Sequence, residues 1–146
     1  LPCFTTASEV GYGAVIASLA VFAAIKSSMF SIDGDALLVG IAATGVISGI
    51  TGSSSGGLSI TLEAFADQLS TMAVEQGISP ETLHRLIAMA SVCFDSLPHN
   101  GAVLTILLVC NMTHKKSYKD IAAVTVVIPL ISLAVLVTGV SLLGGV

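Results

Sequence analysis

The chain has 146 residues, of which 54% are hydrophobic and only 10% are charged, and its mean hydropathy is +0.99. A water-soluble domain carries about 25% charged residues, so this composition excludes a soluble globule and indicates a membrane protein. The formal net charge of −4 and the scattered basic residues exclude a nucleic-acid binder.

The apolar stretches differ in length, and length decides which can cross a membrane. A helix needs about 20 apolar residues to cross roughly 30 Å of hydrocarbon. Residues 121–146 form the stretch that is long and charge-free enough for an uninterrupted span. The other stretches lie at 10–26, 36–50 and 58–74, with a first break at 51–57, and at 83–111, with a second break at 96–100. Short arms meeting at Gly, Ser or Pro are typical of the discontinuous helices and re-entrant hairpins of secondary transporters. The sequence therefore predicts an all-α polytopic membrane protein.

The start of the chain has no initiator Met and no basic signal region, so we expect no signal peptide and a longer parent protein. Polar residues here precede the first apolar stretch. If the upstream residues are apolar, this segment is a further hairpin tip or helix break. Its candidate substrate-binding residues are Thr6, Ser8 and Glu9.

The first break places three serines between glycines, and a helix is expected from Leu58. The free N–H groups at a helix start and the positive end of its dipole form a site for a carboxylate or phosphate. Close packing of helices through small residues is the alternative reading, and it explains Gly45, Gly49 and Gly52. The candidate substrate-binding residues in this break are Ser53, Ser54, Ser55, Gly56 and Gly57.

Four polar residues after the first break, Ser59, Glu63, Asp67 and Ser70, recur at steps of four, four and three and share one helical face. A wet pathway along this face would make Glu63 a candidate proton-coupling residue. Alternatively, the two carboxylates meet headgroups or water at a membrane boundary.

The second break holds Ser96, His99 and Asn100, directly after Asp95. Asp95 and His99 are titratable groups that can exchange a proton, and Asn100 can orient a substrate hydroxyl or carboxylate. The alternative is a polar turn that caps its own helices, with Asp95 bonding backbone N–H groups and Asn100 closing the turn. The two readings are compatible. We therefore take Ser96, His99 and Asn100 as candidates for substrate binding and Asp95 and His99 for proton coupling.

Basic residues flank the stretch at 83–111 on both sides. His84 and Arg85 lie at its start, and a cluster with Lys115, Lys116 and Lys119 follows it. A re-entrant hairpin keeps both groups on one side of the membrane, as the positive-inside tendency prefers, whereas a broken span separates them. We favour the hairpin, with its tip at 96–100.

Catalytic and metal chemistry receive little support. Cys3, Cys93 and Cys110 fit neither a disulfide framework nor zinc spacing, and we expect no metal or other cofactor. Residues 52–56 fit G-x-S-x-G, with Ser54, Asp95 and His99 in hydrolase order. A nucleophile elbow needs a preceding strand, and residues 41–50 are poor strand material. We expect no enzyme, and an intramembrane serine hydrolase is the remote alternative.

Several motifs together resemble one family. They are residues 6–15 (TASEVGYGAV), the glycine-rich break at 49–57, residues 95–103 (DSLPHNGAV) and residues 113–120 (THKKSYKD). In this order they resemble the gluconate permease family of bacterial proton symporters, over nearly the whole chain. The resemblance implies the C-terminal third of a multi-pass inner-membrane carrier, within the ion-transporter superfamily of inverted repeats.

The resemblance also implies uptake of gluconate or a related small hydroxy-carboxylate, driven by the proton gradient. A 3-hydroxybutyrate or other monocarboxylate permease is the alternative within the family, and a membrane-embedded structural subunit is the alternative outside it. The expected partners are a small carboxylate, a proton and membrane lipid; a homo-oligomer and coupling to sodium stay open. We further expect the two breaks to meet near the membrane midplane around a shared aqueous site.

Overall fold

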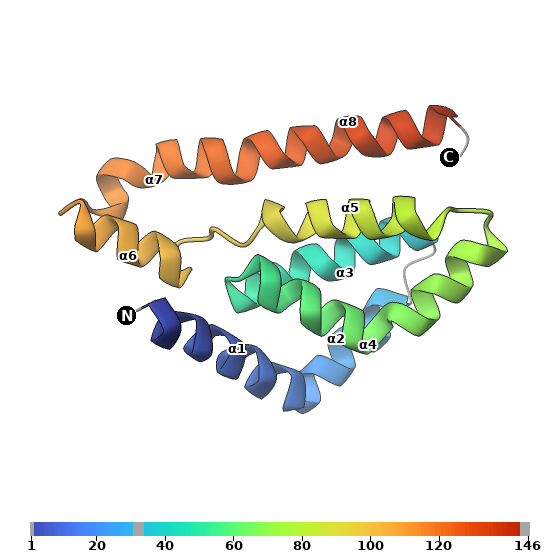
Figure 1. The fold of residues 1–146 in the computed structure, drawn as a ribbon, viewed down its shortest axis with the longest axis horizontal. Helices are drawn as coiled ribbons and strands as arrows, with labels where there is room; N and C mark the ends of the chain where they lie inside the picture. Colours follow the sequence, from blue (N-terminus) through green and yellow to red (C-terminus); the bar gives the residue numbers. More distant parts are fainter. Residues whose placement is uncertain (1, 31–33, 144–146) are drawn as a thin grey trace.

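A computed structural model describes residues 2–30 and 34–143; the side chains at 2, 5, 6, 9, 10, 13, 17, 26 and 30 lie outside the described part. The described residues form helices and connecting turns, which confirms the all-α prediction for this part of the chain (Figure 1). The elements are α1 Pro2–Ser18, α2 Ala20–Phe30, α3 Ala36–Thr51, α4 Ser54–Glu75, α5 Pro80–Cys93, α6 Gly101–Val109, α7 His114–Ala122, the π-helical η1 Ala123–Val127 and α8 Ile128–Leu143.

Local capping signals set several helix starts. Asp35 precedes α3, and its side chain accepts a 2.8 Å hydrogen bond from the N–H of Leu38. Pro80 occupies the first turn of α5, where its missing N–H costs nothing because that donor has no partner within the helix. The expected apolar stretch at 10–26 is divided, because α1 ends at Ser18 and α2 begins at Ala20.

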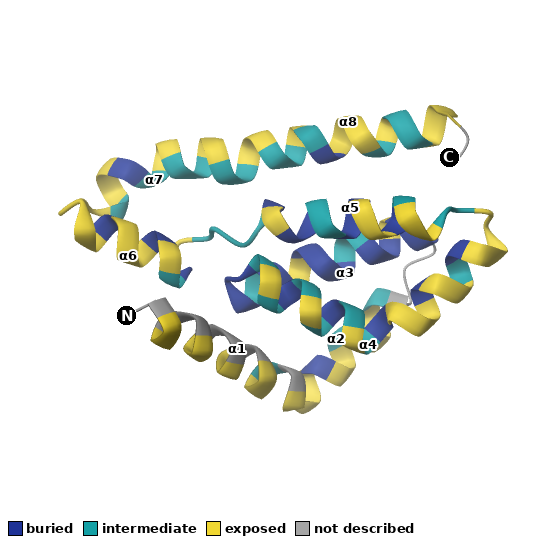
Figure 2. Cartoon of the chain, in the orientation of Figure 1, coloured by how far each residue is buried: buried dark blue, intermediate teal, exposed yellow. Residues whose placement is uncertain are grey.

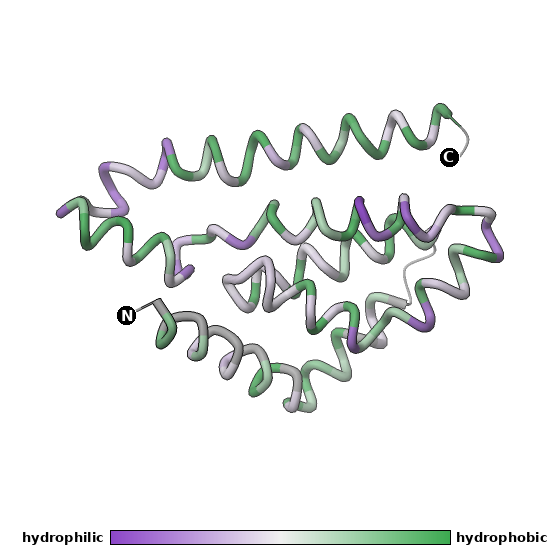
Figure 3. The backbone as a smooth tube through the Cα atoms, in the orientation of Figure 1, coloured by the Kyte–Doolittle hydropathy of each residue, from purple (hydrophilic) through white to green (hydrophobic). Residues whose placement is uncertain are grey.

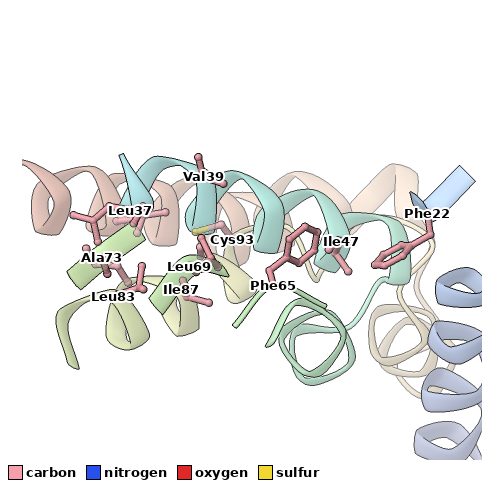
Figure 4. Packing of buried hydrophobic residues seen from close by; sticks show 14 residues of the cluster. Phe22, Leu37, Val39, Ile47, Phe65, Leu69, Ala73, Leu83, Ile87 and Cys93 are labelled. Atoms are coloured by element: carbon pink, nitrogen blue, oxygen red, sulfur yellow. The ribbon is translucent and has the colours of Figure 1, made fainter. Parts of the chain in front are cut away.

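The core lies where α3, α4 and α5 pack together (Figure 4). Bulky apolar side chains from all three helices fill it: Val39 and Ile47 from α3, Phe65 and Leu69 from α4, and Ile87 from α5. Each of these five is at most 2% exposed. Figure 2 shows the buried faces of these helices turned toward one another, while the outer faces of α1, α6 and α8 are largely exposed. This core fixes the ends of α3 and α5, where the two breaks lie.

Helices α3 and α4 form a hairpin that turns back at the first break, and the two helices pack against each other. The stretch at 83–111 takes a different shape from the re-entrant hairpin expected for it. Helix α6 continues beyond the end of α5 instead of returning beside it (Figure 1). Residues 94–100, which connect α5 to α6, form no helix. Side chains of this segment bond instead to backbone carbonyls at the end of α3 and directly after it. The sequence favours the hairpin because that shape keeps the basic residues at both ends of the stretch on one side of the membrane. This tendency was too weak to predict the shape of the stretch.

Helices α7, η1 and α8 run on as one helix, His114–Leu143, of 30 residues. Among the described residues it is the helix that is long and apolar enough to cross a membrane. The most apolar 18 residues of this helix have a mean hydropathy of 2.6, and only 6% of them are buried against the rest of the protein. Its charge-free part, residues 121–143, is about 34 Å long at 1.5 Å per residue, close to the hydrocarbon thickness. Figure 3 shows α8 as hydrophobic and the start of α7 as hydrophilic. The expected span at 121–146 matches this helix up to Leu143; residues 144–146 lie outside the described part.

Candidate functional site

The first break is a sharp turn between two helices. Helix α3 ends at Thr51, and Gly52 adopts a left-handed conformation with φ of 62°, which glycine reaches without steric cost. The N–H of Gly52 donates to the carbonyl of Ser48 at 2.9 Å. Ser53 is extended, and its hydroxyl accepts from the N–H of Gly56 at 3.2 Å, which caps the start of α4. The break thus joins the negative end of one helix dipole to the positive end of the next.

The second break is held by side chains within its own segment. The hydroxyl of Ser96 donates to the carboxylate of Asp95 at 2.7 Å. The side-chain amide of Asn100 donates to the Asp95 carbonyl at 2.8 Å, and its oxygen accepts from the N–H of Val103 at 2.8 Å. Asn100 therefore caps α6 and closes the segment onto itself.

The two breaks meet. The Nε2 atom of His99 lies 2.9 Å from the carbonyl oxygen of Gly49, and the amide nitrogen of Asn100 donates to the carbonyl of Gly52 at 2.6 Å. The last carbonyls of a helix have no partner within the helix, so the second break supplies donors to the end of α3. Phe94 packs against Gly45. The expected approach of the two breaks is confirmed.

A helix starts in or directly after each of the two breaks. Helix α4 begins at Ser54 in the first break, and α6 begins at Gly101 directly after the second. The first N–H groups of any helix lack partners within it, and the helix dipole adds partial positive charge at the same end. Such a pair of starts can bind a carboxylate, whereas the carbonyls at the end of α3 favour donors and positive charge.

Helix α7 covers the other side of the second break. The Tyr118 hydroxyl donates to the Ser96 carbonyl at 3.2 Å, and the Nε2 atom of His114 lies 2.9 Å from the Pro98 carbonyl oxygen. These contacts place the break beside the polar end of the long helix. The expected position of the two breaks near the membrane midplane stays a prediction.

A cavity of about 410 Å³ lies between the second break, α6 and the α7–η1 junction. Asp95 and Asp120 both line it, together with the polar side chains of Ser96, Asn100 and Thr125. Among the described residues that line it, none is basic. Sequence reasoning missed Asp120 and Tyr118; the available signal was that Asp120 is the last charged residue before the charge-free part of the helix.

The serines and glycines of the first break differ in how deeply they are buried and in what they contact. Ser53 is buried, Ser54 is half-buried, and Ser55 is exposed with its hydroxyl 3.4 Å from that of Ser53. Gly56 and Gly57 lie in the first turns of α4, and Gly57 approaches α3 more closely than Gly56 does. A Cβ atom on Gly57 would lie 2.5 Å from the Cα atom of Ser48. Helix packing therefore explains Gly57, as the alternative reading proposed for small residues.

The other predicted site residues lie on helices α1 and α4. Ser8 is exposed on α1, and the side chains of Thr6 and Glu9 fall outside the described part. Glu63 is exposed on the outer side of α4. The segment before Ser54 is helix α3, so the strand that a nucleophile elbow needs is missing at this position.

The chain is similar to an uncharacterized transporter of Bacillus subtilis (strain 168), YxjC, with 42% identity over 127 residues. The aligned part covers 87% of this chain and 27% of that protein, so the chain spans only part of its relative's length. The similarity supports a transporter family and a membrane location, and it does not single out gluconate permeases. No family model matches the sequence. No solved structure matches it either.

Proposed function

We propose that the chain forms part of a proton-coupled secondary transporter of the bacterial inner membrane, which takes up gluconate or a related small hydroxy-carboxylate. The similarity to a transporter supports the class of function. The observation that carries the proposal is the meeting of the two breaks through His99 and Asn100. It brings two helix starts and a titratable imidazole to one place.

In this proposal the substrate carboxylate binds the free N–H groups at the starts of α4 and α6, where the helix dipoles favour an anion. The hydroxyls of Ser54, Ser55 and Ser96 form hydrogen bonds with the hydroxyl groups of the substrate. Asn100 keeps the two breaks together, because its amide hydrogens are used by the carbonyls of Gly52 and Asp95.

His99 carries the coupled proton in this proposal. Histidine is the side chain that most readily takes up and releases a proton near neutral pH. A protonated imidazole next to a bound carboxylate forms a neutral pair, so proton and substrate favour each other's binding. Asp95 and Glu63 are the other proton-coupling candidates, and Asp95 is the closer of these two to His99 in the chain.

The test is uptake by the complete protein in right-side-out membrane vesicles with an imposed pH gradient. A panel of competing hydroxy-acids identifies the substrate: we expect gluconate or a close relative to compete best. Strong competition by 3-hydroxybutyrate alone would favour the monocarboxylate permease. Absence of saturable, pH-dependent uptake with every acid in the panel would contradict the proposal and favour a structural role in the membrane.

A further inference from the structure

The hydrogen bond between His99 and Gly49 determines which ring nitrogen of His99 is available. A backbone carbonyl oxygen only accepts hydrogen bonds, so Nε2, at 2.9 Å from the Gly49 oxygen, must carry the hydrogen. In a neutral imidazole only one nitrogen bears a hydrogen. Nδ1 of neutral His99 is therefore the bare nitrogen.

Gly52 fits the imidazole into this position. A Cβ atom at Gly52 would lie 3.1 Å from Cδ2 and 3.3 Å from Nε2 of His99, so the ring rests against the glycine. The left-handed conformation of Gly52 turns the chain away from the end of α3 at this point. Gly52 therefore has two roles: it forms the turn of the first break, and it leaves space for the imidazole ring of His99.

We propose that Nδ1 of His99 is the atom that carries the coupled proton, with Gly49 and Gly52 as the positions that hold the ring for this role; the inference rests on the proposed function. In the neutral ring, Nδ1 accepts a proton or a hydrogen bond from a substrate hydroxyl. In the protonated ring, Nδ1–H donates to a substrate carboxylate. The proton is the single species gained and lost, and no covalent bond between heavy atoms changes.

This arrangement keeps the ring in place throughout the cycle. Nε2–H donates to Gly49 in both the neutral and the protonated imidazole, so the hydrogen bond survives each gain and loss of a proton at Nδ1. Among the described residues, few charged or titratable groups lie on the elements next to the ring. Helix α3 carries no ionisable side chain, the segment itself contributes Asp95, and α7 contributes His114, bonded to the neighbouring Pro98 carbonyl, and Asp120.

The tautomer is measured by solid-state NMR on the complete protein in lipid bilayers, with ¹⁵N in histidine and ¹³C at the glycine carbonyls. Dipolar coupling between a histidine Nε2 and a glycine carbonyl carbon identifies the His99 ring without any variant. We expect this histidine to carry hydrogen on Nε2 and a bare Nδ1 at high pH, and both hydrogens at low pH. A neutral ring with hydrogen on Nδ1, or no such coupling, would overturn the inference whatever the transport data show.

Transport by variants provides the second readout. In His99→Gln the side-chain amide reaches the position of Nε2 and still donates to Gly49, but it replaces the titrating ring. We expect this variant to keep substrate exchange down a gradient and to lose accumulation against one, with His84→Gln, at an exposed histidine on α5, as the matched control. Normal accumulation by His99→Gln alongside the expected tautomer would overturn the proton role of His99 and this inference with it, while leaving carboxylate transport intact.

Discussion

The side-chain amide of Asn100 donates a 2.6 Å hydrogen bond to the carbonyl oxygen of Gly52, which lies 48 residues earlier in the chain. The same nitrogen donates to the Asp95 carbonyl, and the amide oxygen accepts from the N–H of Val103. One buried side chain therefore connects the end of α3, the second break and the start of α6. Asn100 therefore contributes directly to the meeting of the two breaks.

Asn100→Asp should weaken this connection, because a carboxylate has no hydrogen to donate and would face two carbonyl oxygens. We expect a loss of about 1–3 kcal/mol in unfolding free energy, the usual cost of unsatisfied buried polar groups. Thermal unfolding in detergent measures it. Asn111→Asp is the control: Asn111 is exposed with φ of 51°, a conformation that Asp tolerates. Equal melting temperatures for the two variants would contradict the assigned role.

Ser53→Ala should lower stability by about 1 kcal/mol, because the Ser53 hydroxyl caps the N–H of Gly56. The matched control is Ser79→Ala at the start of α5, since the Ser79 side chain makes no capping hydrogen bond there. We expect that variant to change stability by less than about 0.5 kcal/mol. Chemical denaturation of both variants compares the two caps. An equal effect at both positions would show that the Ser53 cap contributes nothing specific.

Gly57→Ala should disrupt the α3–α4 hairpin. The added Cβ atom would lie 2.5 Å from Cα and 2.7 Å from the backbone nitrogen of Ser48, and backbone cannot move aside as a side chain can. Overpacking of this kind costs about 1–3 kcal/mol, and more where backbone must shift. Gly139→Ala on α8 is the control, because nothing lies within 4 Å of its added atom. A Gly57→Ala protein that melts like the Gly139→Ala protein would disprove the close approach.

Asp120→Asn should shift the pH dependence of uptake. Asp120 shares a cavity with Asp95, and each negative charge favours a positive charge entering the site. Removing one charge makes proton binding less favourable, so half-maximal uptake should move to lower pH. Uptake is measured as a function of external pH, with the exposed Asp67→Asn on α4 as the control. A shift in the opposite direction, or equal shifts in both variants, would contradict an electrostatic effect of Asp120 on proton binding.

The sequence alone determined the class of structure and the local chemistry of the breaks. Composition excluded a soluble globule, and apolar stretches with Gly, Ser and Pro interruptions predicted helices that end where α3 and α5 end. The sequence also predicted a capping turn at Asn100, because a helix cap depends only on residues a few positions away in the chain. The candidate site residues His99 and Ser53 were chosen on the same local grounds.

Only the tertiary structure decided how these pieces meet. Helices α3 and α4 form a hairpin, and α5 and α6 are arranged end to end. His99 and Asn100 bond to backbone carbonyls at the end of α3 and at Gly52, directly after it. Neither the cavity shared by Asp95 and Asp120 nor the tautomer of His99 follows from spacing along the chain. Such contacts join residues about 25 to 50 positions apart, and which helix end lies beside which side chain is settled by packing of the whole core.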